Sequence, residues 1–162
     1  MKRIMFVCSG NICRSPLAHR HFEAVVEEFA AHGEFEVESS GLGSWHVGEN
    51  ADPRMRATAL EHGLKVNHRA RQLTRTDLEE YDLILVMERS HKRQIERQVR
   101  DPEIMEKVRL FREWDPEGEP GAEVPDPYYG GDHGFETVYR MVERTNRALL
   151  AALLDADEAA AG

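Results

Sequence analysis

The chain has 162 residues, 41% hydrophobic and 31% charged, a composition typical of one soluble globular domain. Thirty acidic against 21 basic residues give a net charge of −9, which argues against a nucleic-acid or anionic-membrane partner, because both need a basic face. The chain has no apolar run near the roughly 18 residues of a membrane span, no signal-peptide pattern and too few cysteines for a disulfide framework. We therefore expect a cytoplasmic protein, with a monomer as the default.

Strands and helices alternate along the sequence. In chain order the pattern predicts a strand over 3–7, a helix from Ser15 to Gly33, a strand over 35–39, a helix from Pro53 to about Gly63, a strand over 82–87, a helix over 90–100, a strand over 107–111 and a helix over 135–154. Such alternation predicts an α/β fold in which helices cover both faces of a parallel sheet. Ligands of such sheets bind at the carboxyl ends of the strands.

Proline and glycine mark the irregular segments. The stretch 114–133 is rich in glycine and holds four of the seven prolines, which predicts a long surface loop, and loops of that length are usually functional or disordered. We interpret Asp101-Pro102 and Asp115-Pro116 as turns, and the basic stretch 89–100 as a solvated helix face. Residues 1–154 are predicted to form a single domain, followed by a frayed tail over 155–162.

The most informative pattern follows the first strand, where residues 8–16 read CSGNICRSP. Successive backbone N–H groups in a tight loop form a concave anion site, and the N-terminus of the following helix adds a partial positive charge. Gly10 and Asn11 tolerate the left-handed backbone that such a loop needs, and the guanidinium of Arg14 matches two phosphate oxygens. The positive field favours the thiolate of Cys8, so one loop would supply both a nucleophile and a phosphate cradle.

This loop resembles the signature of the low-molecular-weight protein tyrosine phosphatases. A second signature of that family, Asp-Pro-Tyr-Tyr, is matched by residues 126–129, and further similar stretches lie at 40–41, 45–48, 52–54 and 68–72. The resemblance extends roughly from Arg3 to Leu150. It implies a flavodoxin-like fold, a three-layer sandwich with a central four-stranded parallel sheet.

The resemblance implies a phosphotyrosine-protein phosphatase that needs neither metal nor cofactor. Cys8 is then the nucleophile that forms a phosphocysteine, Arg14 the phosphate clamp and Asp126 the general acid and base. The implied binding residues are Ser9, Gly10, Asn11, Ile12, Cys13, Ser15, Trp45, Tyr128 and Tyr129, with hydrogen-bonding support of the loop from Asn11, Ser15, Ser40 and His68. Implied ligands are a tyrosine-phosphorylated protein or an aryl phosphate, with inorganic phosphate or vanadate as competitors.

Several alternatives stay open. Phosphoarginine phosphatases on the same scaffold tend to carry threonine where this chain has Ile12, so the apolar Ile12 favours tyrosine. A non-catalytic phosphate-binding module would lose the nucleophile or the acid, whereas this chain retains both. An arsenate reductase with an internal cysteine relay is excluded because no cysteine follows Cys13, which is either a buried thiol or a redox partner of Cys8. Glu88, where many family members have aspartate, and Ser39 depart from the family pattern.

Overall fold

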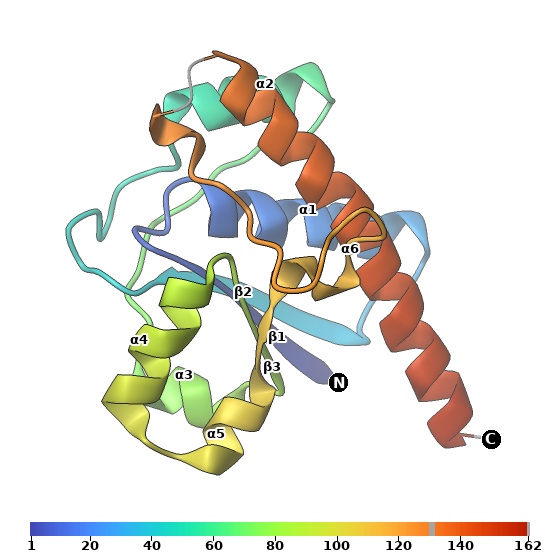
Figure 1. Cartoon of the computed structure of the whole chain (residues 1–162). Helices are drawn as coiled ribbons and strands as arrows, with labels where there is room; N and C mark the ends of the chain where they lie inside the picture. Colours follow the sequence, from blue (N-terminus) through green and yellow to red (C-terminus); the bar gives the residue numbers. More distant parts are fainter. Residues whose placement is uncertain (130–131, 162) are drawn as a thin grey trace.

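The computed structural model describes residues 1–129 and 132–161, without the side chains of residues 129, 132, 133 and 161. A parallel four-stranded sheet in the order β2-β1-β3-β4 forms its centre (Figure 1). The strands are β1 (Lys2–Cys8), β2 (Phe35–Gly41), β3 (Leu83–Val86) and β4 (Val108–Leu110). The predicted parallel sheet and all four predicted strands are confirmed, with ends that differ by no more than about two residues.

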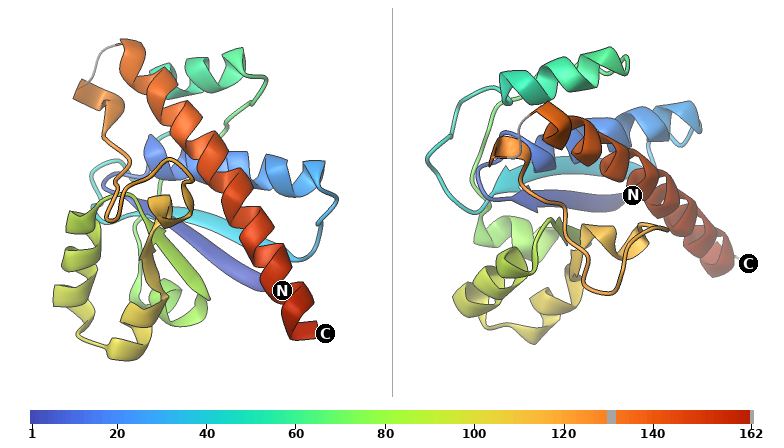
Figure 2. Two further views of the ribbon diagram at one scale, coloured as in Figure 1. Left: turned by 45° about the vertical axis from the view of Figure 1, so that its right-hand side comes forward. Right: turned by 45° about the horizontal axis from the view of Figure 1, so that its top comes forward.

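Helices cover both faces of the sheet, as the α/β prediction requires (Figure 2). They are α1 (Arg14–Glu28), α2 (Pro53–Glu61), α3 (Arg75–Glu80), α4 (Arg89–Val99), α5 (Pro102–Lys107) and α6 (Asp132–Ala161), with 3-10 turns η1 (Phe111–Trp114) and η2 (Pro127–Tyr129). Among the described residues, no helix is both long and apolar enough to cross a membrane.

Alternate side chains of the central strand β1 build two separate cores. Ile4 and Phe6 pack with residues of α1, α2 and α6, whereas Met5 and Val7 pack with residues of α3, α4 and α5. All four side chains are fully buried. Their apolar run follows from this double coverage, because a strand buried on both faces has no polar side.

Two helices end at other residues than the sequence predicts. Helix α1 ends at Glu28 rather than at Gly33, because Ala30 takes a left-handed backbone (φ 54°) and turns the chain before the glycine is reached. Helix α6 extends beyond the predicted 135–154 at both ends. Residues 155–161 are therefore helical where the sequence predicts fraying, while the domain boundary at 154 stays a prediction.

The sequence prediction also lacks two short helices, α3 and α5. The interpretation of Asp101-Pro102 as a turn is wrong, since Asp101 caps α5 by accepting a hydrogen bond from the backbone N–H of Glu103 (3.0 Å). Helix α3 begins with a reciprocal cap between Thr74 and Asp77. Both helices have six residues, too few to show a helical repeat of apolar positions.

The parallel arrangement brings three strand ends to one edge of the sheet. Cys8, the last residue of β1, pairs with Gly41 at the end of β2, and Val7 pairs with Val86 at the end of β3. The loops that follow these strands therefore meet around Cys8.

Candidate active site

A pocket of about 320 Å³ opens at this edge of the sheet. It is lined by Cys8, Ser9, Gly10, Ile12, Cys13, Arg14, Trp45, His46, Asp126 and Tyr128. All of these except His46 are residues that the sequence predicts for the site. The structure brings them together from three distant segments, and their roles remain predictions.

The loop between β1 and α1 is held tightly against the end of β2. The backbone N–H groups of Leu42 and Gly43 donate to the carbonyls of Cys8 and Ser9, each at 3.0 Å. A Cβ atom on Gly41 would lie 2.9 Å from backbone atoms of the loop, including the carbonyl oxygen of Ser9. Glycine is thus required at position 41 because the two backbones approach so closely.

Asn11 is the centre of the hydrogen bonds that shape the loop. Its left-handed backbone (φ 59°) agrees with the predicted tolerance, and its buried amide nitrogen donates to the hydroxyls of Ser15 (2.8 Å) and Ser39 (3.1 Å). The Ser15 hydroxyl lies 3.0 Å from Sγ of Cys8. Gly10, by contrast, has no left-handed backbone, so the tolerance predicted for it is not used; a Cβ atom on Gly10 would lie 2.8 Å from the ring of His46, so glycine leaves room for that ring.

Ser40 and His68 lie behind the loop, outside the pocket lining. The Ser40 carbonyl accepts a hydrogen bond from the Ser15 hydroxyl (3.3 Å), while the Ser40 hydroxyl donates to the sulfur of Met5 (3.3 Å). Nε2 of His68 lies 2.9 Å from the carbonyl oxygen of Asn11, so it is the protonated nitrogen. Burial lowers the pKa of His68 to about 4, and the ring is therefore neutral near pH 7.

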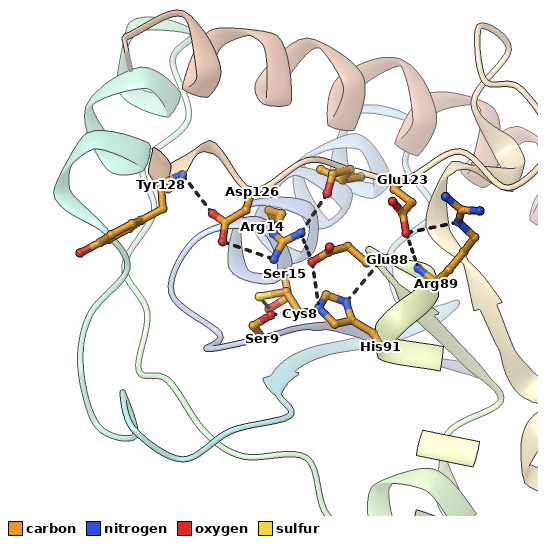
Figure 3. A network of polar contacts seen from close by, with 11 residues as sticks. Cys8, Ser9, Arg14, Ser15, Glu88, Arg89, His91, Glu123, Asp126 and Tyr128 are labelled. Carbon is orange, nitrogen blue, oxygen red and sulfur yellow. Dashed lines mark hydrogen bonds and ion pairs between the residues drawn. The ribbon is translucent and has the colours of Figure 1, made fainter. Parts of the chain in front are cut away.

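Arg14 connects the loop with two other segments, the one after β3 and the one before η2 (Figure 3). Its guanidinium is almost fully buried and donates to the carboxylate of Glu88 (2.8 Å) and the carbonyl of Val124 (2.9 Å). Burial alone would lower the pKa of Arg14, but the neighbouring Cys8 and Glu88 raise it above its ordinary value. A permanently charged planar donor therefore faces the pocket in a fixed orientation.

Asp126 lies across the pocket on the loop before η2. Its side chain is 41% exposed, and Oδ2 lies 3.8 Å from Nη2 of Arg14. Oδ1 accepts a hydrogen bond from the backbone N–H of Tyr128 (3.0 Å), a turn that aims the carboxylate at the pocket. Tyr128 and Trp45 are exposed at the mouth, and the side chain of Tyr129, also predicted for the site, lies outside the described part of the structure.

Four polar residues around the loop are absent from the predicted site: Ser39, His46, Glu88 and His91. Glu88 is the second residue after the end of β3, a position at which an α/β fold places site residues, and this signal was available from the sequence. His91 lies in the stretch interpreted as a solvated helix face. That stretch is mostly exposed, but His91 itself is buried.

Cys13 is buried at the base of the pocket, and both cysteines are free thiols. Burial, and then the neighbouring Cys8, raise the pKa of Cys13 far above its ordinary value, so it stays protonated. Among residues 1–129 and 132–161, no group of three His, Cys, Asp or Glu side chains is placed to hold a metal ion.

A cysteine at the base of an anion-binding loop, with an arginine in the loop and a carboxylic acid opposite, is an arrangement typical of cysteine-dependent phosphatases. Residues 3–159 match the profile of the low molecular weight phosphotyrosine protein phosphatases, and the chain belongs to this family. The chain is 43% identical over 152 residues to the low molecular weight protein-tyrosine-phosphatase of Streptomyces coelicolor, a match that covers 93% of each chain. Membership makes it a hydrolase of the protein-tyrosine-phosphatase class.

Solved structures agree with this assignment. A protein tyrosine phosphatase from Entamoeba histolytica with Hepes in its active site superposes with a TM-score of 0.90 at 29% identity, covering 97% of this chain and 99% of that one. The arginine phosphatase YwlE from Bacillus subtilis superposes with a TM-score of 0.83 at 28% identity, covering 93% and 95%. The scaffold is therefore shared by a tyrosine and an arginine phosphatase.

Proposed function

We propose that this phosphatase removes phosphate from phosphotyrosine in proteins through a phosphocysteine intermediate on Cys8. The observation that carries the proposal is the convergence of Cys8, Arg14 and Asp126 in one pocket of about 320 Å³. A nucleophile, a cation and an acid in one pocket are the groups that the transfer of a phosphoryl group requires.

In the first step, the thiolate of Cys8 attacks the phosphorus while the bond from phosphorus to the tyrosyl oxygen breaks. Arg14 and the backbone N–H groups of the loop hold the equatorial oxygens, where the charge of the transition state lies. Asp126 donates a proton to the leaving phenolate, whose ordinary pKa near 10 makes it a poor leaving group without one. The Ser15 hydroxyl, 3.0 Å from Sγ, turns its one proton from the Ser40 carbonyl to the thiolate before the attack.

In the second step, a water molecule attacks the phosphorus of the phosphocysteine. Asp126, now a carboxylate, takes a proton from this water, the bond between sulfur and phosphorus breaks, and the thiolate is restored. The related YwlE supports such a covalent step, because its cysteine-to-serine mutant carries a phosphorylated active-site serine. No step in this scheme needs a metal or a cofactor.

The walls of the pocket favour an aromatic substrate. Ile12 is apolar, and Trp45 and Tyr128 offer ring faces at the mouth, with the guanidinium of Arg54 4.8 Å from the ring centroid of Tyr128. Such walls bind a phenyl ring by burial and by edge or face contacts. Phosphoarginine is the second candidate substrate, because YwlE shares the fold at 28% identity.

The test compares phosphate release from a phosphotyrosine peptide and a phosphoarginine peptide of the same sequence, in EDTA. We expect turnover of phosphotyrosine alone, and none by Cys8→Ser, which should still bind vanadate. Preference for phosphoarginine would retain the covalent mechanism and overturn the substrate. Turnover by Cys8→Ser would overturn the mechanism, and vanadate binding without turnover of either peptide by the unaltered chain would indicate a binding module.

A further inference from the structure

One buried histidine lies beside the pocket and has no part in the proposed reaction. His91 is in the first turn of α4, and only 3% of its surface is exposed, although its neighbours Arg89 and Ser90 are exposed. Burial of a polar ring is costly unless its nitrogens are hydrogen-bonded. The partners of the ring therefore indicate what it does.

Both ring nitrogens of His91 have partners. The backbone N–H of Glu88 donates to Nδ1 at 3.2 Å, so the proton of the neutral ring is on Nε2. Nε2 lies 3.0 Å from Oγ of Ser9 and 3.2 Å from Oε2 of Glu88 (Figure 3). The Nε2–H group is thus directed at a hydroxyl and a carboxylate.

These two partners belong to opposite ends of the phosphate loop. Ser9 directly follows the nucleophile, and its carbonyl is already held from the other side by the N–H of Gly43 (3.0 Å). Glu88 accepts a hydrogen bond through the same Oε2 atom from Nη1 of Arg14 (2.8 Å), the arginine that ends the loop. One imidazole therefore contacts Ser9 at one end of the phosphate loop and Glu88, the partner of Arg14, at the other end.

We propose that His91 is a positioning residue, which holds Ser9 and, through Glu88, Arg14 at a fixed separation across the phosphate. This inference rests on the proposed function and adds to it a third segment, α4, that preorganises the loop. Donors that are fixed in advance stabilise the transition state without the cost of reorganisation. The effect of His91 should therefore appear in the rate of the chemical step more than in substrate binding.

Burial, helped by one of the charges around His91, keeps this arrangement in one protonation state. The charged groups facing the ring are Arg14 of α1, Glu88 before α4, and Glu123 and Asp126 of the long loop. Burial, and next the cation of Arg14, lower the pKa of His91 to about 4, against the opposing effect of the three carboxylates. The ring is neutral near pH 7, and Nδ1 stays available as an acceptor.

Two substitutions of His91 separate its two contacts. In His91→Asn the short amide reaches the position of Nδ1 and retains the bond from Glu88, but the bridge to Ser9 is lost. In His91→Gln the longer amide reaches the position of Nε2 and restores the bridge. Ser9→Ala removes the bridge from the other end, and Ser90→Ala, on the exposed neighbouring residue, is the matched control.

We expect His91→Asn and Ser9→Ala each to lower kcat for a phosphotyrosine peptide about fivefold to tenfold, the range of one hydrogen bond, with KM changed less than twofold. Vanadate, which mimics the five-coordinate transition state, should lose affinity in parallel, and phosphate less. The double variant should lose no more than His91→Asn alone, His91→Gln should recover to within twofold of the unaltered chain, and Ser90→Ala should have no effect.

Three results would overturn the positioning role. The first is an unchanged kcat in folded His91→Asn and Ser9→Ala, and the second is losses of kcat that multiply in the double variant. The third is a His91→Gln variant that is as slow as His91→Asn and has an altered acid limb of its pH profile, which would indicate that His91 is a titrating catalytic group. If thermal unfolding shows that His91→Asn is not folded, Ser9→Ala, which leaves α4 intact, decides. Turnover by Cys8→Ser tests the proposed function separately, since no His91 result depends on it.

Discussion

The phosphate loop and the loop that carries Asp126 face each other across one pocket, but they are built differently. In the phosphate loop, Asn11 and Ser15 are completely buried and bonded to β2 and to each other. Asp126 is 41% exposed and accepts its hydrogen bond from Tyr128, two residues along its own turn. Stabilisation of charge requires donors fixed in advance, whereas a proton donor can reach its final geometry after the substrate binds. The phosphate loop, which we call the rigid region, therefore suits binding of the phosphate. The loop that carries Asp126, which we call the open region, suits proton transfer to leaving groups of different shape.

The largest effect is expected from the open region. Asp126→Asn should lower kcat for phosphotyrosine about 10²–10⁴-fold, because the amide cannot donate a proton to the phenolate. The loss should be much smaller for an aryl phosphate whose phenol is acidic, since such a leaving group needs no proton. A series of aryl phosphates with different phenol pKa values measures this dependence.

The matched control for Asp126 is Glu123→Gln in the same loop. Glu123 pairs with Arg89 at 3.4 Å and does not line the pocket, so this substitution should change kcat less than about threefold. Equal losses for good and poor leaving groups in Asp126→Asn would refute proton donation and leave Asp126 with an electrostatic role only.

The next effect concerns the rigid region. Asn11→Ala should lower the free energy of unfolding by about 2–4 kcal/mol, because Ala is strained at φ 59° and the buried partners of the amide lose their bonds. We also expect kcat/KM to fall about 10–100-fold, as the loop loses its shape. Denaturant unfolding and steady-state kinetics measure the two losses, with Asn67→Ala on the exposed surface as control. Full activity in Asn11→Ala would show that the loop retains its shape without this amide.

The same contrast explains what the sequence could predict. The phosphate loop lies within residues 8–16, directly between a strand and a helix, and all its chemistry is local in sequence. The position of this loop between a strand and a helix follows from the local pattern, and the parallel sheet follows from the alternation of strands and helices along the chain. The proline-rich composition likewise places Asp126, the proposed acid, in a long loop, although it gives no distance to Arg14.

The contacts that hold the loop from outside could not be predicted in this way. Glu88 is 74 residues from Arg14, His91 is 82 from Ser9, and Ser39 is 28 from Asn11. A single polar residue on a helix or at a strand end has no periodic signal, so its burial depends on the packing of the whole chain. Gly10 illustrates the limit. The need for glycine at this position is explained by the ring of His46, which is distant in the sequence, and not by the backbone of Gly10 itself.

A smaller effect, on the free energy of unfolding, is expected at low pH from His68, which supports the rigid region. The pKa of His68 is lowered to about 4 in the folded chain by burial, against about 6.5 in the unfolded chain. Between these values the unfolded chain binds more protons, so the free energy of unfolding falls as the pH falls from 6.5 towards 4. We expect His68 to contribute about 1–2 kcal/mol of this loss between pH 7 and pH 5.

Urea unfolding at a series of pH values tests this contribution. His68→Asn should flatten the pH dependence but not remove it, because burial also lowers the pKa of His21 and His91 to about 4. His32→Asn, on the exposed surface, should leave the curve unchanged. Parallel curves for the unaltered chain and His68→Asn would show that His68 does not contribute to the pH dependence of the free energy of unfolding.

The smallest effect is expected at the mouth of the pocket, where the open side of the site meets the substrate. The ring of Trp45 is 69% exposed and rests against Gly43, where an added Cβ would overlap it. Trp45→Ala should raise KM for a phosphotyrosine peptide about threefold to fivefold with little change in kcat, because a partly exposed ring contributes roughly 1 kcal/mol of contact to both the ground state and the transition state. Inhibition by inorganic phosphate should be unchanged, since phosphate reaches only the rigid loop, and Val47→Ala, exposed but outside the pocket lining, is the control. Weaker phosphate inhibition in Trp45→Ala would show that the two regions are coupled, and that the mouth helps to shape the loop beneath it.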